Sequence, residues 1–263
     1  MWEPAGVVDE TAWAEVFTSV FEAPPSAVQA RIWTEVYGDE YPAELEPYSF
    51  ITRSELRSFV QHLDLTSADT LVDVGCGRGG PGLWVAATTG ASLLGVDISP
   101  TAVADAARRA VGLGLDGTTR FVVGRFDAIP AETASVTAMM SIDALLFAPD
   151  KVAAIREFSR VLAPGGRLVA TTWDYRSQPV GRPPQVADHR PLLVEAGFSV
   201  LHYDETPGWE ANHRRLDELL LDAVDELAAE SGEDPADVRA GVQEMAASVD
   251  TMLRRVLVVA LKE

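Results

Sequence analysis

Short apolar runs alternate with amphipathic segments along the middle of the chain. Five runs have the length and composition of buried parallel strands. They cover residues 71–74, 92–97, 120–123, 135–142 and 168–172. Most of them are separated by segments whose apolar residues recur at intervals of three or four, which predicts helices. Strands that alternate with helices predict an α/β fold with a doubly wound, mostly parallel sheet.

Two more apolar runs, at 198–203 and 255–261, lie in the C-terminal part of the chain and complete a predicted seven-stranded sheet. A long segment with two amphipathic stripes lies between these runs, and we expect a helical pair packed over the mouth of the site. A polar, proline-rich loop at 176–184 is expected to be mobile. The predicted organisation is an N-terminal helical arm or lid at 1–66, a binding core at 67–204, a helical cap insertion at 205–253 and the final strand at 254–263.

The first predicted strand ends in the glycine-rich turn Gly75-Cys76-Gly77-Arg78-Gly79-Gly80. A strand, a glycine-rich turn and a helix are typical of the corner that binds phosphates or nucleosides in doubly wound folds. Glycine allows a ligand to lie against the backbone, and it adopts positive φ easily. The spacing fits both G-x-G-x-x-G and G-x-G-x-G. It therefore does not separate a dinucleotide site from another nucleoside site, or from a tight turn without a ligand.

Two acidic residues favour a ligand at this turn. Asp73 lies inside the strand, where a dinucleotide fold normally has an apolar residue, and a buried carboxylate must be satisfied. The N–H groups of the turn or a cationic ligand could satisfy it. Asp97 ends the second strand about 20 residues further on, where a carboxylate can accept both hydroxyls of a ribose.

Four motifs in this order resemble the class I S-adenosylmethionine-dependent methyltransferases. They are Asp73–Gly79, Gly95–Ser99, Gly124–Ala128 and Leu162–Leu168. The resemblance extends from about residue 67 to residue 200, with a matching last strand near 255–262, and is nearest to the small-molecule, secondary-metabolite branch. It implies a Rossmann-like fold, methyltransferase activity in natural product biosynthesis and S-adenosyl-L-methionine as the cofactor.

The resemblance also implies where this cofactor binds. Asp97 would hold the ribose, and Asp127 would meet the adenine amino group with Phe126 or Ala128 beside the ring. The implied cofactor-binding residues are Asp73, Gly75, Cys76, Gly77, Gly79, Asp97, Ile98, Phe126, Asp127, Ala128 and Ser141.

The expected chemistry is mainly the alignment of a nucleophile with the methyl group, and a general base is needed only when the acceptor must lose a proton. Many O-methylating relatives have a His after the fourth strand, where this chain has Leu146 and Phe147. We therefore expect N-, C- or O-methylation that relies on proximity. Asp143 is the predicted catalytic residue, which orients the acceptor or takes a late proton.

The acceptor is expected to be a small, fairly apolar or aromatic metabolite. Its predicted contacts are Tyr48, Phe147, Trp173, Tyr175 and Trp209. Asp174, His189 and His213 remain alternative bases.

The composition limits the classes of partner that we expect for this protein. The chain has 263 residues with 40 acidic and 21 basic side chains, a formal net charge of −19. Nucleic-acid binding depends on Lys and Arg, so no nucleic acid is expected. Cys76 is the only cysteine, which excludes an intramolecular disulfide and a multi-cysteine metal site, and no metal is expected. No apolar run reaches membrane-spanning length and no signal peptide is apparent, so a cytoplasmic protein without membrane contact is expected. Monomer and homodimer remain open.

Three other functions are compatible with parts of this pattern. A pericyclase-like enzyme would use the same bound cofactor without transferring its methyl group. An NAD-dependent oxidoreductase is disfavoured by Asp73 and by the Pro164-Gly165-Gly166 turn before the fifth strand. A regulatory or scaffold protein could keep the nucleotide fold, but the complete glycine turn with both acids argues against it.

Overall fold

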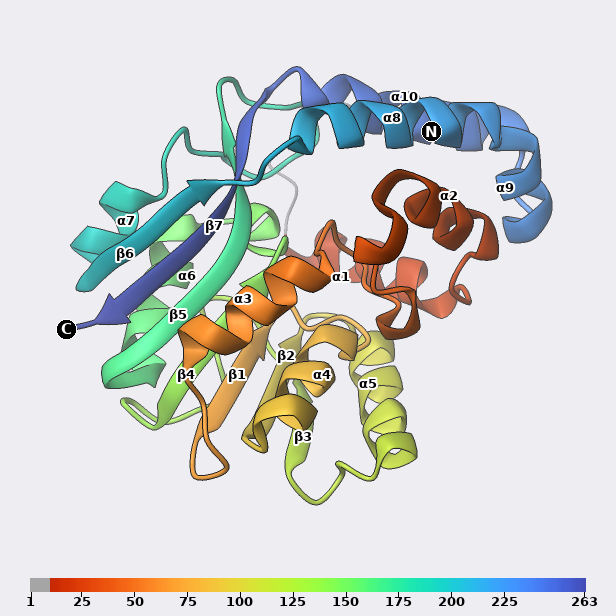
Figure 1. Ribbon diagram of the computed structural model, residues 1–263. Helices are drawn as coiled ribbons and strands as arrows, with labels where there is room; N and C mark the ends of the chain where they lie inside the picture. The colour runs from red at the N-terminus through yellow and green to blue at the C-terminus, as the bar shows by residue number, and fades with distance from the viewer. Residues whose placement is uncertain (1–9) are drawn as a thin grey trace.

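The computed structural model describes residues 10–263, so the first nine residues of the predicted arm lie outside the described part. The core is a seven-stranded sheet in the order β3-β2-β1-β4-β5-β7-β6 (Figure 1). Its strands are β1 Thr70–Val74, β2 Ser92–Asp97, β3 Thr119–Val123, β4 Val136–Ile142, β5 Leu162–Tyr175, β6 Phe198–Glu205 and β7 Met252–Lys262. β7 runs antiparallel between β5 and β6, and the other pairs are parallel. The predicted doubly wound sheet is confirmed.

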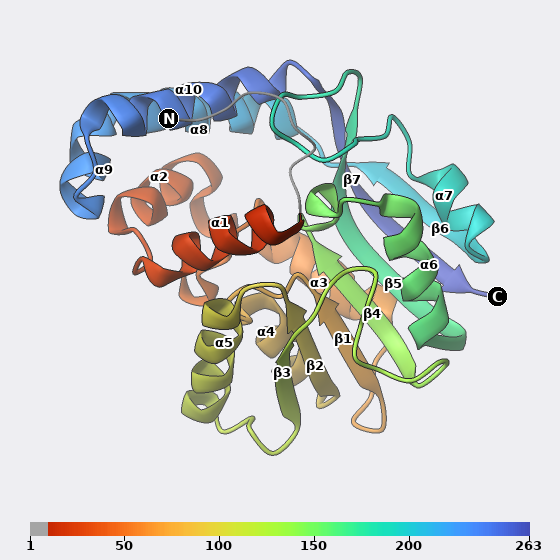
Figure 2. The same ribbon diagram turned by 180° about the vertical axis from the view of Figure 1, so that it is seen from behind.

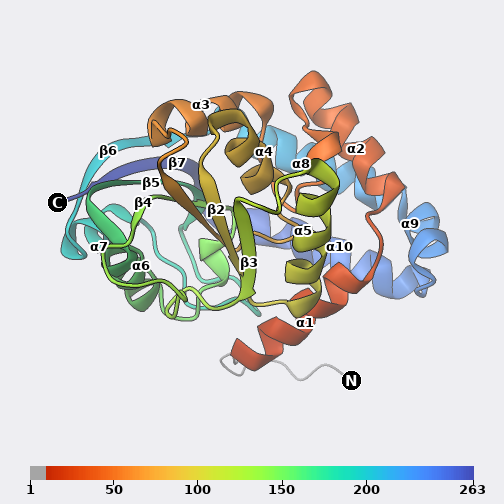
Figure 3. The same ribbon diagram turned by 90° about the horizontal axis from the view of Figure 1, so that it is seen from below.

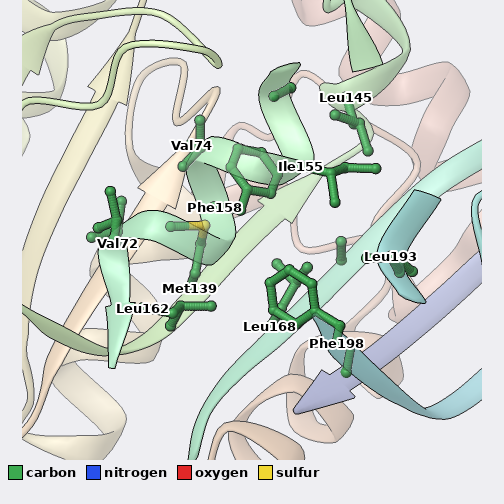
Figure 4. Packing of buried hydrophobic residues seen from close by; sticks show 14 of the residues in the cluster. Val72, Val74, Met139, Leu145, Ile155, Phe158, Leu162, Leu168, Leu193 and Phe198 are labelled. Carbon is green, nitrogen blue, oxygen red and sulfur yellow. The ribbon is translucent and has the colours of Figure 1, made fainter. Parts of the chain in front are cut away.

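Helices cover both faces of this sheet (Figure 3). One face carries α3 Arg53–Leu63, α4 Gly80–Thr89 and α5 Pro100–Leu113, and the other carries α6 Lys151–Val161 and α7 Arg190–Glu195. On the second face, Ile155 and Phe158 of α6 pack against Val72, Val74 and Met139 of the strands (Figure 4). These apolar contacts hold the strands that carry the site.

Polar side chains at the helix starts fix where the chain leaves the strands and loops. Thr52 accepts a hydrogen bond from Glu55 N and its own N–H donates to the Glu55 carboxylate, a capping box that begins α3. Ser99 accepts from Ala102 N at the start of α5, and Asp150 accepts from Ala153 N at the start of α6. These caps set the positions at which the loops end.

The parallel register brings several sequence motifs to one edge of the sheet. Asp73 lies opposite Gly95 of β2 and opposite Met140 of β4. β1 ends one residue later, at Val74, and β2 and β4 each end two residues later, at Asp97 and Ile142. The glycine turn, Asp97 and Asp143 therefore emerge together at the carboxyl ends of the strands, where open α/β sheets bind ligands.

The N-terminal arm lies across that edge. It contains α1 Glu10–Glu22, α2 Ala27–Tyr37 and the short 3-10 turns η1 Gly38–Glu40 and η2 Ala43–Leu45. Figure 2 and Figure 3 show α1 near the level of the carboxyl ends of the strands, beside α5. The arm contacts the glycine turn directly, since a Cβ on Gly80 would lie 1.9 Å from Leu45 O.

The insertion before the last strand forms α8 Trp209–Asp222, α9 Val224–Ser231 and α10 Pro235–Val249. The first predicted stripe is divided at Ala223, between α8 and α9. Leu216, Leu220 and Leu227 of this insertion pack on Ile32 of α2, and α8 and α10 extend beyond the sheet over α2 (Figure 1). No helix among residues 10–263 is long and apolar enough to cross a membrane.

Candidate functional site

A cavity opens where β1, β2 and β4 end, beneath α1. Its empty space, including the opening to solvent, is about 990 Å³, at the upper end of the range for small-molecule sites. The glycine turn forms its floor, and aromatic side chains of the arm form much of its wall. Its lining includes Trp13, Phe17, Phe21, Tyr48, Asp73, residues 75–81, Asp97, Ile98, residues 124–126, Asp143 and Phe147.

The glycine turn presents bare backbone to this cavity. Gly75 has φ 76°, and a Cβ there would lie 2.4 Å from the Cβ of Ala144, so both conformation and packing require glycine. The N–H groups of Gly75 and Cys76 donate to Val96 O at 2.8 and 3.1 Å, which holds the turn against β2. The turn is thus rigid and open to a ligand on its cavity side.

Asp97 lies at the end of β2 and is 8% exposed. Its Oδ2 accepts from Gly77 N at 2.8 Å and its Oδ1 from Ser99 N at 2.9 Å. Burial raises the pKa of Asp97, and the N–H groups of Ser99 and Gly77 oppose that shift. Each oxygen keeps a free lone pair, so the carboxylate can still accept hydrogen bonds from ribose hydroxyls.

Asp73 is buried at the end of β1, with 3% of its surface exposed. No donor among the described residues forms a hydrogen bond with its carboxylate, although the side chain lines the cavity. Burial, with a smaller contribution from the charge of Asp97, raises the pKa of Asp73 to about 8. A cationic group in the cavity would satisfy this carboxylate, so the residues present fit a nucleoside that carries a positive charge.

Asp143 follows β4 and adopts φ 48°. Its two oxygens pair with Arg255 of β7, Oδ1 with Nε at 2.9 Å and Oδ2 with Nη2 at 3.0 Å. Oδ2 also accepts from Phe50 N at 2.9 Å. Arg255 pairs through Nη1 with Glu55 as well. Burial acts to lower the pKa of Arg255, but Asp143 and Glu55 together raise it above its ordinary value. Asp143 therefore belongs to a fully formed ionic network at the back of the cavity.

Aromatic rings cover the opposite side of the cavity. Phe147, in the 3-10 turn η3 Leu145–Phe147, meets Phe17 edge to face at 4.8 Å between ring centroids and Trp13 at 5.1 Å. Tyr48 meets Phe21 at 5.7 Å. These five rings make an apolar wall beside the glycine turn, which we call the aromatic wall.

Comparison with known proteins tests the predicted resemblance. The family described as methyltransferase domain matches residues 72–170, which contain the glycine turn and all four motifs. Methyltransferase GfsG of Streptomyces halstedii is 26% identical over 209 residues, 73% of this chain and 74% of that protein. The predicted resemblance to the class I S-adenosylmethionine-dependent methyltransferases is confirmed over these residues. This methyltransferase is an enzyme of small-molecule type with S-adenosylmethionine as its cofactor.

Solved structures show the same fold. The [4+2]-cyclase SpnF superposes with a TM-score of 0.70 at 24% identity, over 95% of this chain and 96% of that chain. The geranyl diphosphate C-methyltransferase from Streptomyces coelicolor A3(2), solved with Mg²⁺, geranyl-S-thiolodiphosphate and S-adenosyl-L-homocysteine, superposes with a TM-score of 0.68 at 20% identity over the full length of both chains. Other curated methyltransferases match over less than half of their own length.

Most of the predicted cofactor residues of the methyltransferase line the cavity, but three do not. Ser141 is fully buried and donates to Val74 O at 2.9 Å, so its hydroxyl joins β4 to β1. Asp127 pairs with Arg125 at 2.9 Å outside the cavity, and Ala128 forms a bridge to Arg125. Gly124 and Arg125 contribute to the lining instead.

The predicted acceptor contacts also fall into two groups, one inside the cavity and one outside it. Tyr48 and Phe147 line the cavity, whereas Trp173, Tyr175 and Trp209 do not. These last three pack with one another and with Leu146, Val249 and Met252 between the end of β5 and the insertion. The ring centroids of Trp173 and Trp209 lie 5.2 Å apart. The insertion therefore covers this cluster and α2, and none of residues 205–253 lines the cavity beneath it.

The alternative bases lie outside the cavity as well. Asp174 is fully buried and accepts from His189 Nδ1 at 2.9 Å, Tyr203 Oη at 2.7 Å and Arg254 Nε at 2.8 Å. His213 stacks on Phe50 with 4.7 Å between ring centroids, and burial lowers its pKa to about 4. Both groups are parts of the scaffold of the methyltransferase.

Sequence reasoning missed Arg255 and the three rings of α1. An arginine inside an apolar strand pattern is a signal for Arg255, because a buried guanidinium requires a partner. The α1 rings repeat at helical spacing, which is equally typical of a helix packed on a core.

Proposed function

We propose that this methyltransferase methylates a small, fairly apolar or aromatic metabolite, and that it does so by holding the acceptor in line with the methyl group. The observation that carries the proposal is the continuity of the cavity. One side is the glycine turn with Asp73 and Asp97, and the other is the aromatic wall. A nucleoside and an apolar acceptor would therefore lie side by side.

The glycine side supplies the groups that would hold the cofactor. The turn would support it through backbone, Asp97 would accept hydrogen bonds from its ribose, and Asp73 would pair with its positive charge. S-adenosylmethionine supplies an electrophilic methyl group when it is bound. The remaining work of the protein is to exclude water and to position the acceptor, and orientation can contribute about 7–11 kcal/mol.

The aromatic wall would orient the acceptor. Phe147 and Phe17 present apolar surface to the cavity, and neither carries a group that can take a proton. Asp143 also lines the cavity, but both of its oxygens are paired with Arg255. Its role is therefore to position groups at the back of the cavity, and the acceptor must be nucleophilic enough to need little deprotonation.

A binding experiment and a turnover experiment test this proposal. Calorimetry is expected to show micromolar binding of S-adenosylmethionine and S-adenosylhomocysteine and no binding of NAD. Incubation with a panel of small aromatic amines, phenols and prenyl compounds is expected to release S-adenosylhomocysteine and to add one CH₂ to the acceptor mass.

The other outcomes identify the alternatives. An acceptor converted to an isomer of unchanged mass, with S-adenosylmethionine left intact, would indicate a pericyclase-like enzyme. Stoichiometric binding of reduced NAD would favour an oxidoreductase. Absence of any adenosyl ligand would favour a regulatory or scaffold role.

The same proposal covers partners and location. The strongly acidic composition of the chain supports small molecules rather than nucleic acid as partners. The proposed place of action is the cytoplasm. Monomer and homodimer are both compatible with a cavity built from one chain.

A further inference from the structure

We infer that the acceptor carries an oxyanion, a carboxylate or a phosphate, which binds Arg182 at the edge of the aromatic wall. The inference rests on the proposed function and names the polar part of its substrate class. It comes from two features: the position of Arg182 and the hydrogen bonds that hold its loop.

Arg182 lies against two rings of the cavity wall. Its Cζ is 4.9 Å from the centroid of the Phe147 ring and 5.6 Å from that of Trp13. Stacking on these rings favours the cation without using its N–H donors. The guanidinium therefore lies beside two rings that line the cavity, and its donors are available to a ligand that extends past these rings.

The two arginines that line the cavity differ from Arg182 in their pairing. Arg78 and Arg125 both line the cavity, and each is paired with a carboxylate, Asp105 at 3.3 Å and Asp127 at 2.9 Å. Within residues 10–263, Arg182 forms neither an ion pair nor a side-chain hydrogen bond. Although the chain has 40 acidic residues, none of those within the described part pairs with this guanidinium.

The loop that carries Arg182 is held by its own side chains. The Gln178 amide donates to the carbonyls of Pro179, Arg182 and Pro183 at 3.0–3.1 Å. Its oxygen accepts from Gln185 N at 2.9 Å. The proline-rich loop at 176–184, which is expected to be mobile from its sequence, is therefore held together by the side-chain hydrogen bonds of Gln178.

A buried lysine ties this loop to the turn that carries Phe147. Lys151 is 4% exposed, and its ammonium donates to Leu146 O at 3.3 Å, Ala148 O at 3.2 Å and Pro184 O at 2.6 Å. The Gln185 amide also reaches Leu146 O at 2.8 Å. These bonds hold Arg182 and Phe147 in one unit, so little ordering would be needed when a ligand binds.

Matched probes test the charge requirement on the full chain saturated with S-adenosylhomocysteine. The probes are 2-naphthylacetate and its neutral amide, with 2-naphthyl phosphate to distinguish carboxylate from phosphate. Calorimetry is expected to show that the native protein binds at least one of the two anions about tenfold or more tightly than the amide, as a charge-assisted hydrogen bond predicts. Arg182→Gln should remove this preference. Arg176→Gln should keep it, because Arg176 is exposed on the same loop and its guanidinium donates to Met252 O at 2.9 Å, away from the cavity.

Three results would overturn the inference: equal or absent binding of the anions and the amide by the native protein, a preference that survives in Arg182→Gln, or an equal loss for all probes. The last would mean that Arg182 only supports the aromatic wall. Affinity for S-adenosylhomocysteine is measured first in each variant. Its absence in the native protein would refute the proposed function, whereas intact cofactor binding without anion preference would refute this inference alone.

Discussion

The two halves of the ligand-binding edge each bury a pair of aspartates, yet they treat these carboxylates differently. On the glycine side, Asp73 and Asp97 have no cationic partner among the described residues, and Asp97 is held by backbone N–H groups. On the side of β7, Asp143 and Asp174 are each paired with an arginine. All four side chains are at most 8% exposed.

Two consecutive residues of β7 cause this difference. Side chains alternate between the two faces of a strand, so Arg254 and Arg255 point to opposite sides. Arg255 reaches Asp143, and Arg254 reaches Asp174 at 2.8 Å. Burial alone therefore does not identify a functional carboxylate. The acids at the glycine turn are available to a cationic ligand, whereas the acids beside β7 belong to the scaffold.

The largest expected effect comes from removing the scaffold cation. Arg255→Met leaves the buried Asp143 and the partly buried Glu55 without their cation, so we expect the free energy of unfolding to fall by about 3–5 kcal/mol. Thermal and urea unfolding measure it. As a control, Arg215→Met removes an exposed arginine paired with Glu35 and should cost less than about 1 kcal/mol. Equal effects of the two substitutions would remove the distinction between the halves.

Asp73 should have the opposite effect on stability, because its buried carboxylate has no cationic partner among the described residues. Its pKa of about 8 exceeds the ordinary value of 3.8, so the unfolded chain ionises first as the pH rises. Stability of the ligand-free protein should therefore fall between about pH 4 and pH 8, by on the order of 3–5 kcal/mol.

Asp73→Asn should remove most of this slope and raise the melting temperature near pH 8, while weakening S-adenosylmethionine binding. Melting curves across the pH range compare it with the native protein. A variant that melts lower than the native protein at pH 8 would contradict the assignment of Asp73 as an unsatisfied acid.

Asp97→Ala tests the ribose contact. Loss of charge-assisted hydrogen bonds worth about 1.5–3 kcal/mol should weaken S-adenosylmethionine binding on the order of ten- to a hundredfold. Calorimetry gives the affinity, and Asp127→Ala is the matched control because Asp127 lies outside the cavity and pairs with Arg125. Unchanged affinity in Asp97→Ala would refute the ribose contact, and a loss in Asp127→Ala would restore the predicted adenine contact.

Asp143→Asn separates positioning from base catalysis. We expect the rate with a suitable acceptor to stay within about tenfold, since general bases contribute about 10²–10⁴-fold. The measurement is the rate at saturating cofactor, with folding checked by thermal melting. A thousandfold loss with cofactor binding intact would show that Asp143 is a base despite its pairing with Arg255.

The smallest effect is expected at the cluster under the insertion. Trp209→Phe loses the hydrogen bond from Nε1 to Glu205 at 3.0 Å, worth about 1 kcal/mol of stability, and should leave the affinities for cofactor and 2-naphthylacetate unchanged. Phe147→Ala, in the aromatic wall, should weaken only the naphthyl probe. The reverse pattern would place the acceptor beneath the insertion, as the sequence predicted.

The sequence by itself determined the sheet and the glycine side of the site. Strand and helix periods are local properties, and the ends of neighbouring parallel strands meet at one edge. This is enough to bring the glycine turn, Asp97 and Asp143 together. The four motifs also carried the resemblance to class I methyltransferases, because they occur in order at the ends of successive strands.

Only the tertiary structure decided which groups face those residues. Arg255 is 112 residues from Asp143, and no local pattern specifies such a partner. Likewise, an apolar stripe shows that a helix is covered without showing by what. The rings of α1 cover the cavity, whereas those of Trp173, Tyr175 and Trp209 cover one another. The spacing of apolar residues shows which face of a helix or strand is buried. Which residues cover that face depends on packing between segments that are distant in the sequence.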